Sequence, residues 1–522
     1  MCLQRGAAER LQAAFDRGLE ASGKAGSSMR IALVNPVARR TEGYHTIGTR
    51  IPQLGLQVLA RLVPRGHQVE IIDEIFGQAD TVALLSSRGY DMVGVTAYSS
   101  GATRAYELAA MCRSRGLQCI MGGPHASAMP GEALEHFDSV AVGECDEVWP
   151  RIVEDAAAGR MRRTYEGNFS DLAAGYGAAE QALQPVNGRY DVGCIQTSRG
   201  CPVGCEFCSV TRFNGPTIRR RAIDDIITEW NSTTRKFLFV VDDNFFGVGP
   251  RHAAWAKELL RAIIRRGRKR LWFSQTTVNM GEDREGLRLA YRAGCRGMLV
   301  GFESFSASDL RQYRKGVNQA PSRTLSRLGG LNAGVLERYR QMVDGFHRAG
   351  IAVFGGFIVG GDHDTEDTVA DTALQAVQAG IDIVQFTNLT PLPGTKLYER
   401  LLGEGRIFAN NYPADWERYT FVETVYTPAQ VSARRLDEMI CELRYAAATE
   451  PWVWKRTLKT LWRTRSLSTA IFVHGMNKGW VRMARIQARR DVERFGRPGP
   501  GARIDKIRRA FRFASGRAVA TR

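Results

Sequence analysis

Three cysteines stand within eight residues of one another, in the segment SRGCPVGCEFCSV that follows a run of β-forming residues. Cys201, Cys205 and Cys208 form a C-x-x-x-C-x-x-C array. Three thiolates suit a cuboidal iron–sulfur cluster with one iron left open, whereas a structural zinc site normally has four ligands. No fourth Cys or His stands nearby at pair spacing, because Cys194 lies within the preceding run. A zinc knuckle or a set of buried thiols is the alternative, but the spacing favours a 4Fe-4S cluster.

Polar residues also stand where two later predicted strands end. They are Asp242, Asp243 and Asn244 after the run KFLFVV, and Gly301, Glu303 and Ser304 at the end of GCRGMLVGFES. A carboxylate at a strand end accepts a hydrogen bond from an ammonium group or a ribose hydroxyl of a ligand. Asp and Asn also cap the helix that follows a strand, and Glu303 has Arg296 and Lys315 as alternative ion-pair partners. Taken without the cysteines, these residues therefore indicate a ligand site only weakly.

Five short strands separated by helical segments occupy the first part of the chain. The strands are IALVNP, QVEIID, DMVGVTAYSS, LQCIMGG and SVAVGE, and helical periodicity follows residues 54–63 and 102–115. This alternation predicts an α/β fold with a doubly wound, Rossmann-like parallel sheet over residues 29–155. Ligands of such sheets lie beyond the carboxyl ends of the strands, several of which are glycine-rich here.

A second series of strands predicts a partial (β/α)6 barrel over residues 190–427. Its strands are GCIQTS, KFLFVVDD, RLWFSQTT, GCRGMLVGFES, IAVFGGFIVG and DIVQFTNLTPL. Chemistry in such barrels takes place at the C-terminal ends of the strands. The other segments are expected to be an N-terminal extension, a linker, an exposed insertion in the barrel and a helical, basic C-terminal region, namely residues 1–28, 156–189, 319–334 and 428–522.

The composition is that of a globular protein without a membrane span. The chain has 522 residues, of which 44% are hydrophobic and 24% charged, and it contains no run of about 18 apolar residues. The first thirty residues carry charges throughout and lack the apolar core of a signal peptide, so export is not expected. Ten irregularly spaced cysteines do not indicate a disulfide scaffold. We therefore expect a reducing, cytoplasmic location.

The formal net charge of +18 is concentrated near the C-terminus. Residues 451–522 contain 19 Lys and Arg against Asp491, Glu493 and Asp505, which accounts for 16 of the 18 excess positive charges. The remainder of the chain is close to neutral, which argues against an extended groove for nucleic acid. Nucleic acid is therefore not an expected partner.

Tryptophans are interleaved with Lys and Arg in the same region, at Trp452, Trp454, Trp462 and Trp480. This combination suits an anionic membrane surface and would make the protein membrane-peripheral. A solvated basic tail or an RNA contact explains the pattern equally well.

The cysteine array resembles the signature of the radical S-adenosylmethionine (SAM) superfamily. The resemblance implies that Cys201, Cys205 and Cys208 hold the 4Fe-4S cluster and that S-adenosyl-L-methionine chelates the open iron through its amino and carboxylate groups. Reduction by a donor such as flavodoxin or ferredoxin would then cleave SAM to methionine and a 5′-deoxyadenosyl radical. The resemblance also implies SAM contacts at the strand-end residues Asp242, Asp243, Asn244, Gly301, Glu303 and Ser304.

A doubly wound domain ahead of such a barrel resembles the cobalamin-binding domain of the cobalamin-dependent radical SAM proteins. The stretch RIPQLGLQVLARLVPRGHQVEIIDE and the motifs GVTAYSS, GGPH and VGECDE carry this resemblance, which extends over most of the chain. A nucleotide-binding or purely structural domain is the alternative. Cobalamin contacts are expected at Tyr98, Ser99, Ser100, Gly101, Thr103, Gly122, Gly123, Pro124, Gly143 and Glu144.

One departure concerns the cobalt ligand. No D-x-H-x-x-G occurs in the sequence, so by analogy with this family the cobalt is expected to be base-off without a histidine ligand. His45 and His125 lie near predicted strand ends, but a lone histidine is more often a hydrogen-bonded turn or surface residue than a ligand.

The order of the motifs DDNF, GFES, GGFIVGGDHDT and TPLPGTKLYERL is similar to the hopanoid methylase branch of this family. The resemblance implies a C-methyltransferase acting on an unactivated carbon of an apolar or polycyclic, lipid-like small molecule, with methylcobalamin as the methyl source. An oxidative cyclase or rearrangement enzyme with the same cofactors is one alternative. A cobalamin-sensing or nucleic-acid-binding protein with a structural cluster is the other, and the intact cysteines and near-neutral body speak against it.

Overall fold

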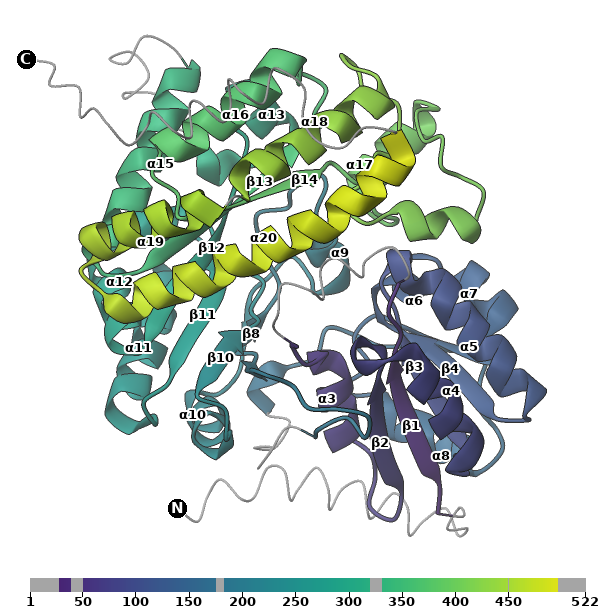
Figure 1. The fold of residues 1–522 in the computed structure, drawn as a ribbon. Helices are drawn as coiled ribbons and strands as arrows, with labels where there is room; N and C mark the ends of the chain where they lie inside the picture. Colours follow the sequence, from purple (N-terminus) through teal and green to yellow (C-terminus); the bar gives the residue numbers. More distant parts are fainter. Residues whose placement is uncertain (1–27, 39–49, 175–182, 320–330, 449, 496–522) are drawn as a thin grey trace, which may run out of the picture.

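The computed structural model describes residues 28–38, 50–174, 183–319, 331–448 and 450–495 (Figure 1). Six parallel strands form the sheet of its N-terminal part, in the order β2-β1-β3-β4-β5-β6. The order reverses between β1 and β3, which is the mark of a doubly wound sheet and confirms the expected fold. β6 lies in the segment expected to be a linker. The bounds are β1 (Arg30–Asn35), β2 (Gln68–Asp73), β3 (Met92–Thr96), β4 (Gln118–Gly122), β5 (Ser139–Val142) and β6 (Thr164–Glu166).

Helices cover both faces of this sheet. Ile31 and Leu33 of β1 pack toward α3 (Leu54–Arg61) and α8 (Trp149–Ala157), while the alternate residues Ala32 and Val34 pack on the opposite side. That side is covered by α4 (Gln78–Ser87), α5 (Ala102–Ser114), α6 (Gly123–Ala128) and α7 (Pro130–His136). Burial on both faces explains why the strands are continuous apolar runs.

A second sheet of six parallel strands has the order β14-β13-β12-β11-β10-β7 and matches the six strands expected of a partial barrel. Its bounds are β7 (Gly193–Ile195), β10 (Phe237–Val240), β11 (Leu271–Thr276), β12 (Cys295–Glu303), β13 (Ala352–Val359) and β14 (Ile383–Asn388). Of the expected insertion, residues 320–330 lie outside the described residues, and residues 331–334 already belong to the helix that follows.

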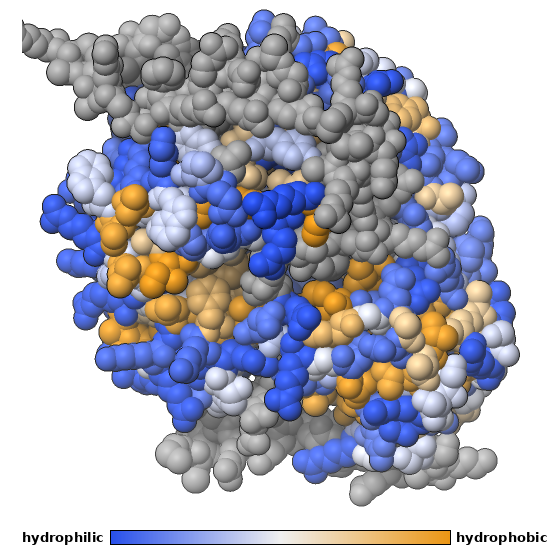
Figure 2. Space-filling view, viewed as in Figure 1, coloured by the Kyte–Doolittle hydropathy of each residue, from blue (hydrophilic) through white to orange (hydrophobic). Residues whose placement is uncertain are grey.

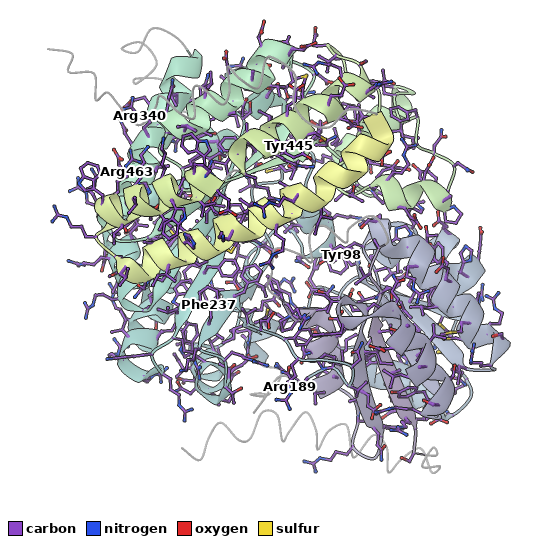
Figure 3. All side chains as sticks on the ribbon, viewed as in Figure 1. Tyr98, Arg189, Phe237, Arg340, Tyr445 and Arg463 are labelled. Carbon is purple, nitrogen blue, oxygen red and sulfur yellow. The ribbon has the colours of Figure 1, made fainter. Side chains whose placement is uncertain are left out.

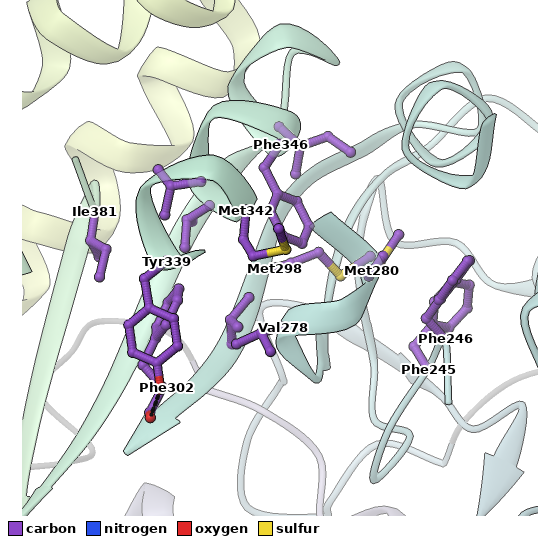
Figure 4. Close-up of a cluster of buried hydrophobic side chains, with 14 of the residues drawn as sticks. Phe245, Phe246, Val278, Met280, Met298, Phe302, Tyr339, Met342, Phe346 and Ile381 are labelled. Atoms are coloured by element: carbon purple, nitrogen blue, oxygen red, sulfur yellow. Dashed lines mark hydrogen bonds between the residues drawn. The ribbon is translucent and has the colours of Figure 1, made fainter. Parts of the chain in front are cut away.

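The outer face of this sheet packs against amphipathic helices. They are α10 (Ile223–Ser232), α11 (Pro250–Arg266), α12 (Arg284–Arg292), α15 (Leu331–Arg348), α16 (Glu366–Gln378) and α18 (Ala433–Ala447). Met298 and Phe302 of β12 meet Tyr339 and Met342 of α15 in this core, where the Tyr339 hydroxyl donates to the Phe302 carbonyl at 2.7 Å (Figure 4). Capping side chains fix the helix starts; Thr365, for example, accepts from the Thr368 amide at the start of α16.

The inner face of the same sheet is covered by the C-terminal helix. α19 (Glu450–Thr464) and α20 (Leu467–Phe495) form a helical pair, and α20 runs across the strands (Figure 1). Phe472 and Trp480 of α20 pack with Phe354 of β13. The next residue along the strand, Val353, packs against the outer helices, so the two helical layers lie on opposite faces of the sheet. A Cβ on Gly297 would stand 2.3 Å from the Phe472 ring, so glycine is required there for close packing. Because these contacts lie toward the N-terminal ends of the strands, α20 closes the bottom of the barrel and leaves its C-terminal ends open.

Among the described helices, none has both the length and the apolar character needed to cross a bilayer.

Candidate functional site

The cysteine loop is closed at its base by two short antiparallel strands, β8 (Ser198–Arg199) and β9 (Arg219–Arg220). Inside the loop the Cys201 amide donates to the Gly215 carbonyl at 3.1 Å, and the Cys208 amide donates to the Cys205 carbonyl at 3.2 Å. Gly200 has φ +94°, and a Cβ there would stand 2.1 Å from the Thr217 carbonyl oxygen. The turn before Cys201 is therefore open only to glycine.

The two carboxylates that follow β10 anchor this loop. Asp243 accepts from the Gly200 amide at 2.8 Å and from the Asn214 side-chain amide at 3.0 Å, which ties both sides of the loop to the strand end. Asp242 is fully buried and accepts from the amides and hydroxyls of Thr197 and Ser198. Burial raises the pKa of Asp242 to about 6, although these four hydrogen bonds oppose the rise. Its carboxylate is thus committed to the segment that leads into the loop.

The other strand-end candidates form a second cluster at the end of β12. Glu303 has φ +65° and its Oε1 lies 2.9 Å from Nζ of Lys315, and both side chains are buried. Burial lowers the pKa of Lys315, but the charges of Glu303 and Cys205 outweigh it and raise the pKa overall. Lys315, which the sequence presented only as one partner for Glu303, is therefore a fixed cation beside the cysteines. The Ser304 hydroxyl donates to Asp309 at 3.2 Å.

Asn244 is held by hydrogen bonds within the protein. Its side-chain oxygen accepts from the amides of Gly247 at 3.2 Å and Thr277 at 3.3 Å, which links the ends of β10 and β11. Gly301 leaves room for the adjacent ion pair, since a Cβ there would stand 2.3 Å from Glu303 Oε1.

The donor set of the loop fits a cuboidal cluster. Burial raises the pKa of the Cys205 thiol and raises that of Cys208 to about 12, and the positive charge of Lys315 opposes both shifts. In the described part of the chain, no group of three or more His, Cys, Asp or Glu side chains gathers closely enough to bind a single metal ion. The three cysteines of a cuboidal cluster each bind a different iron, so they stand further apart than the ligands of one ion.

Two adjoining cavities, of about 780 and 530 Å³, lie between the carboxyl ends of the first sheet and the cysteine loop. They share part of their lining, including Tyr98, Pro124, Gly143 and Phe213. Tyr98 lies between the two domains (Figure 3), and 61% of its surface is exposed. Because Phe213 follows Cys208 by five positions, the cysteine loop and the sheet ends open onto the same space.

Nine of the ten residues expected to contact cobalamin line these cavities. Thr103 is the exception, because its hydroxyl donates to the Pro413 carbonyl at 3.1 Å. The nine are Tyr98, Ser99, Ser100, Gly101, Gly122, Gly123, Pro124, Gly143 and Glu144. Of the six residues expected to contact SAM, Asp243 is the one that lines either of these two cavities.

The smaller cavity lies over the strand ends, and its volume of about 530 Å³ leaves room for the nucleotide tail expected of a cobalamin. Small residues form its floor, and apolar side chains such as Leu56, Ile120 and Trp149 form its walls. A Cβ on Gly123, at φ +89°, would stand 2.4 Å from the Thr96 hydroxyl, and one on Gly143, at φ +80°, 2.6 Å from the Gly167 carbonyl. Only glycine allows the backbone to approach so closely, and a flat aromatic base suits the space that results.

His125 takes no part in the cavity lining. It is fully buried, its Nδ1 lies 3.1 Å from the Ser99 hydroxyl, and its Nε2 lies 3.0 Å from the Tyr106 hydroxyl and 3.3 Å from Glu132. Both ring nitrogens are thus occupied by protein partners. His45 lies outside the described residues.

An ion cluster that the sequence did not predict joins the two domains beside the site. Arg199 binds both carboxylate oxygens of Asp146, at 2.8 and 2.9 Å, and lies 3.2 Å from Glu144. Arg219, on the paired strand, also binds Glu144. Because these arginines lie at the base of the cysteine loop, the pairing fixes the loop relative to the end of β5.

Family models match two separate parts of the chain. A family model for the B12 binding domain matches residues 44–153, and a model for the Radical SAM superfamily matches residues 195–376. The chain is 28% identical over 435 residues to the bacteriochlorophyllide d C-8(2)-methyltransferase of Chlorobaculum tepidum, covering 79% of this chain and 88% of that protein. It is 26% identical over 382 residues to the hopanoid C-3 methylase of Methylococcus capsulatus, covering 68% and 69%.

A solved structure shares the fold. The radical SAM methyltransferase TsrM from Kitasatospora setae, solved with cobalamin and a 4Fe-4S cluster, superimposes with a TM-score of 0.62 at 17% identity, over 88% of this chain and 100% of that one. With a B12-binding domain ahead of a radical SAM domain, the chain belongs to the cobalamin-dependent radical SAM enzymes, whose cofactors are cobalamin, SAM and a 4Fe-4S cluster.

Proposed function

We propose that this protein is a C-methyltransferase that acts on an unactivated carbon of an apolar or polycyclic small molecule. The observation that carries the proposal is the shared space between the domains: Ser209 and Phe213, which follow Cys208, line the same cavity as the strand ends of the B12-binding domain. Radical generation and methyl transfer both have to reach one substrate, and a cavity shared by the two domains allows this. The relatives named above support it, since both are named as methylating enzymes.

The chain itself contributes ligands, orientation and exclusion of water. Cys201, Cys205 and Cys208 would hold the cluster, and Asp243 would hold the loop in place through Gly200 and Asn214. When bound, the cluster supplies the electron that cleaves SAM, and cobalamin carries the methyl group to be transferred. The nine cavity residues named above would hold cobalamin. The six strand-end residues expected to contact SAM would position it, either by touching it or by holding the cysteine loop in place. Reduced flavodoxin or ferredoxin is the proposed electron donor, in a reducing cytoplasm.

The lining of the larger cavity supports an apolar substrate. Side chains such as Ile51, Ile75, Leu392 and Phe421 contribute most of its surface from both domains. Such a lining stabilises an apolar ligand and keeps water away from a reactive radical.

The decisive experiment is anaerobic reconstitution with iron, sulfide and hydroxocobalamin, followed by visible and EPR spectroscopy and by product mass. The Cys201, Cys205 and Cys208 triple alanine variant should lack the cluster signal, whereas a Cys441→Ala control on α18 should keep it. A product heavier by one CH2 supports methyl transfer. A product that is oxidised or isomerised instead indicates the cyclase class, and a wild-type protein without a cluster rejects the proposal.

We also propose that α19 and the start of α20 contact an anionic membrane surface. Six large apolar side chains are exposed on this helical pair, with Trp462 80% and Leu467 66% exposed: Trp454, Leu458, Leu461, Trp462, Leu467 and Ile471. Figure 2 shows apolar side chains in orange on the left of the molecule, where Figure 1 places these helices. Residues 451–490 contain ten Lys and Arg and no Asp or Glu, so the patch has a basic border. Trp480 lies elsewhere, because it packs against Phe354.

Vesicle flotation tests this contact. Vesicles of phosphatidylcholine with phosphatidylglycerol should bind the protein, and phosphatidylcholine alone should bind it much less. Replacing Leu458 and Trp462 by Ser should weaken binding about a hundredfold, at roughly 1.5 kcal/mol for each apolar side chain withdrawn from the lipid. Leu402→Ser, at an exposed position on α17 (Lys396–Gly403), is the matched control. Equal binding by all variants, or a stable dimer that the double substitution abolishes, would reject the membrane contact.

A further inference from the structure

One charged side chain faces the larger cavity. Among the described residues that line this space, Arg212 is the single ionisable group other than tyrosine, and apolar, hydroxyl or amide side chains make up the rest. It belongs to the short helix α9 (Val210–Phe213), four positions after Cys208. Arg212 therefore lines the cavity from the side of the cysteine loop.

Arg212 has no polar side-chain partner among the described residues. Within the described part of the chain, its guanidinium makes no hydrogen bond and no ion pair, unlike Arg199 and Arg219 at the base of the same loop. Its stem lies along the loop before α17, since a Cβ on Gly394 would stand 3.7 Å from the Arg212 Cγ. The stem of the side chain is thus held by an apolar contact, and its guanidinium is available to bind a ligand.

The charge becomes costly once ligands fill the cavity. Arg212 is exposed, so water solvates its guanidinium while the space is open. An apolar ligand that covers this side chain displaces that water and offers no acceptor. A ligand that carries an anionic oxygen group would instead form charge-assisted, two-pronged hydrogen bonds with the guanidinium. The cavity therefore selects for a ligand with an apolar body and one anionic end.

We infer that Arg212 forms an anion subsite for the substrate, and that the substrate is an amphiphile whose apolar body carries a carboxylate or phosphate. The inference rests on the proposed function, because it takes the part of the larger cavity beside the cysteine loop as the place where the substrate binds, and leaves the part at the strand ends to cobalamin. The phosphate of cobalamin is the other source of such a group. The glycine-lined slot suited to the cofactor's nucleotide tail is the smaller cavity, however, and Arg212 does not line it.

Equilibrium dialysis of the protein reconstituted with cluster and cobalamin tests the subsite. The probes are pyrenebutyrate, a polycyclic carboxylate, and pyrenebutanol, its uncharged counterpart. The wild type should bind the carboxylate about tenfold more tightly than the alcohol, as expected for a hydrogen bond to a charged group. Arg212→Gln should bind both probes equally, Arg212→Lys should keep part of the preference, and Arg288→Gln, at an exposed position on α12, should behave as the wild type.

Several results would overturn the inference. They are a preference that survives in Arg212→Gln, equal or absent binding of both probes by the wild type, and loss of the cobalamin absorbance from Arg212→Gln, which would assign the arginine to the cofactor. The readout is binding and needs no turnover. A protein that shows the preference but yields no methylated product would therefore contradict the proposed reaction and leave the subsite in place.

Discussion

Asp362 and Asp364 stand two positions apart after β13, and their carboxyl groups titrate in opposite directions. Burial and the nearby charge of Asp309 raise the pKa of Asp364 to about 7, although the amides of Gly360 and Gly361 donate to it. Burial also acts to raise the pKa of Asp362, but hydrogen bonds from Arg406 and Gln312 and the charge of Arg400 lower it overall. One sequence motif therefore contains two carboxyl groups with different physical roles.

The directions of the two pKa shifts determine how each carboxyl group changes the free energy of unfolding with pH. Asp364 contributes fully to stability below its unfolded pKa of 3.8, and the contribution is lost as the pH rises toward 7. Asp364→Asn should therefore gain stability relative to the wild type between pH 5 and pH 8, by at most roughly 3 kcal/mol, because about two pKa units at about 1.4 kcal/mol each lie in this window. Asp362 contributes above its unfolded pKa, so Asp362→Asn should be less stable than the wild type over the same range. Urea unfolding across this range measures both, and parallel curves for the two variants would contradict the assignment.

A substitution at Gly122 tests whether cobalamin binds in the smaller cavity. A Cβ there meets nothing closer than 3.9 Å, so that a larger side chain projects into the smaller cavity without disturbing the sheet. Gly122→Val should lower cobalamin affinity about tenfold or more through overpacking, while leaving the iron content unchanged. Gly131→Val in α7, where the surroundings are open, is the control. Normal cobalamin absorbance in Gly122→Val would show that the tail binds elsewhere.

At the scale of elements, the packing of α20 against the inner face of the barrel depends on the contact between Gly297 and Phe472. Gly297→Ala places a Cβ 2.3 Å from the Phe472 ring and should cost about 1 to 3 kcal/mol of unfolding free energy. Phe472→Ala removes a packed ring and should cost about 3 kcal/mol. The double variant should cost less than the two together, because the shorter side chain relieves the clash. Chemical denaturation measures the cycle, and additive costs would mean that α20 does not pack there in solution.

The helices that cover this barrel also show which structural features can be predicted from sequence patterns. Period-2 and period-3.6 patterns located the strands and helices of both sheets because burial of one face is a local property of the chain. The same patterns did not distinguish Trp480, which packs inside the barrel, from Trp462, which is exposed on α19. That difference depends on where each helix docks.

For the whole molecule, Arg199 holds the two domains together. Its bidentate pair with Asp146 and its contact with Glu144 are buried between the domains. Arg199→Gln leaves the Asp146 carboxylate without its cation, whereas Glu144 keeps Arg219, and the substitution should cost about 3 to 5 kcal/mol. Arg266→Gln, which breaks an exposed pair with Asp224, should cost about 0.5 kcal/mol or less. Thermal unfolding of the two variants, together with their cobalamin and iron contents, would check both predictions. Equal losses of stability would show that Arg199 does not hold the two domains together.

The sequence by itself determined the cofactor class, because the cluster ligands lie within eight residues and their spacing is a property of one loop. It also determined the two sheets and nine of the residues that line the cavities, since ligands meet parallel sheets at the carboxyl ends of their strands. Only the tertiary structure decided the partners: Asp242 binds the loop entry, Lys315 lies beside the cysteines, Arg199 joins Glu144, and Arg212 is left facing the cavity. Such pairings join residues far apart in the chain, so they depend on strand order and domain docking, which no local pattern of residues encodes.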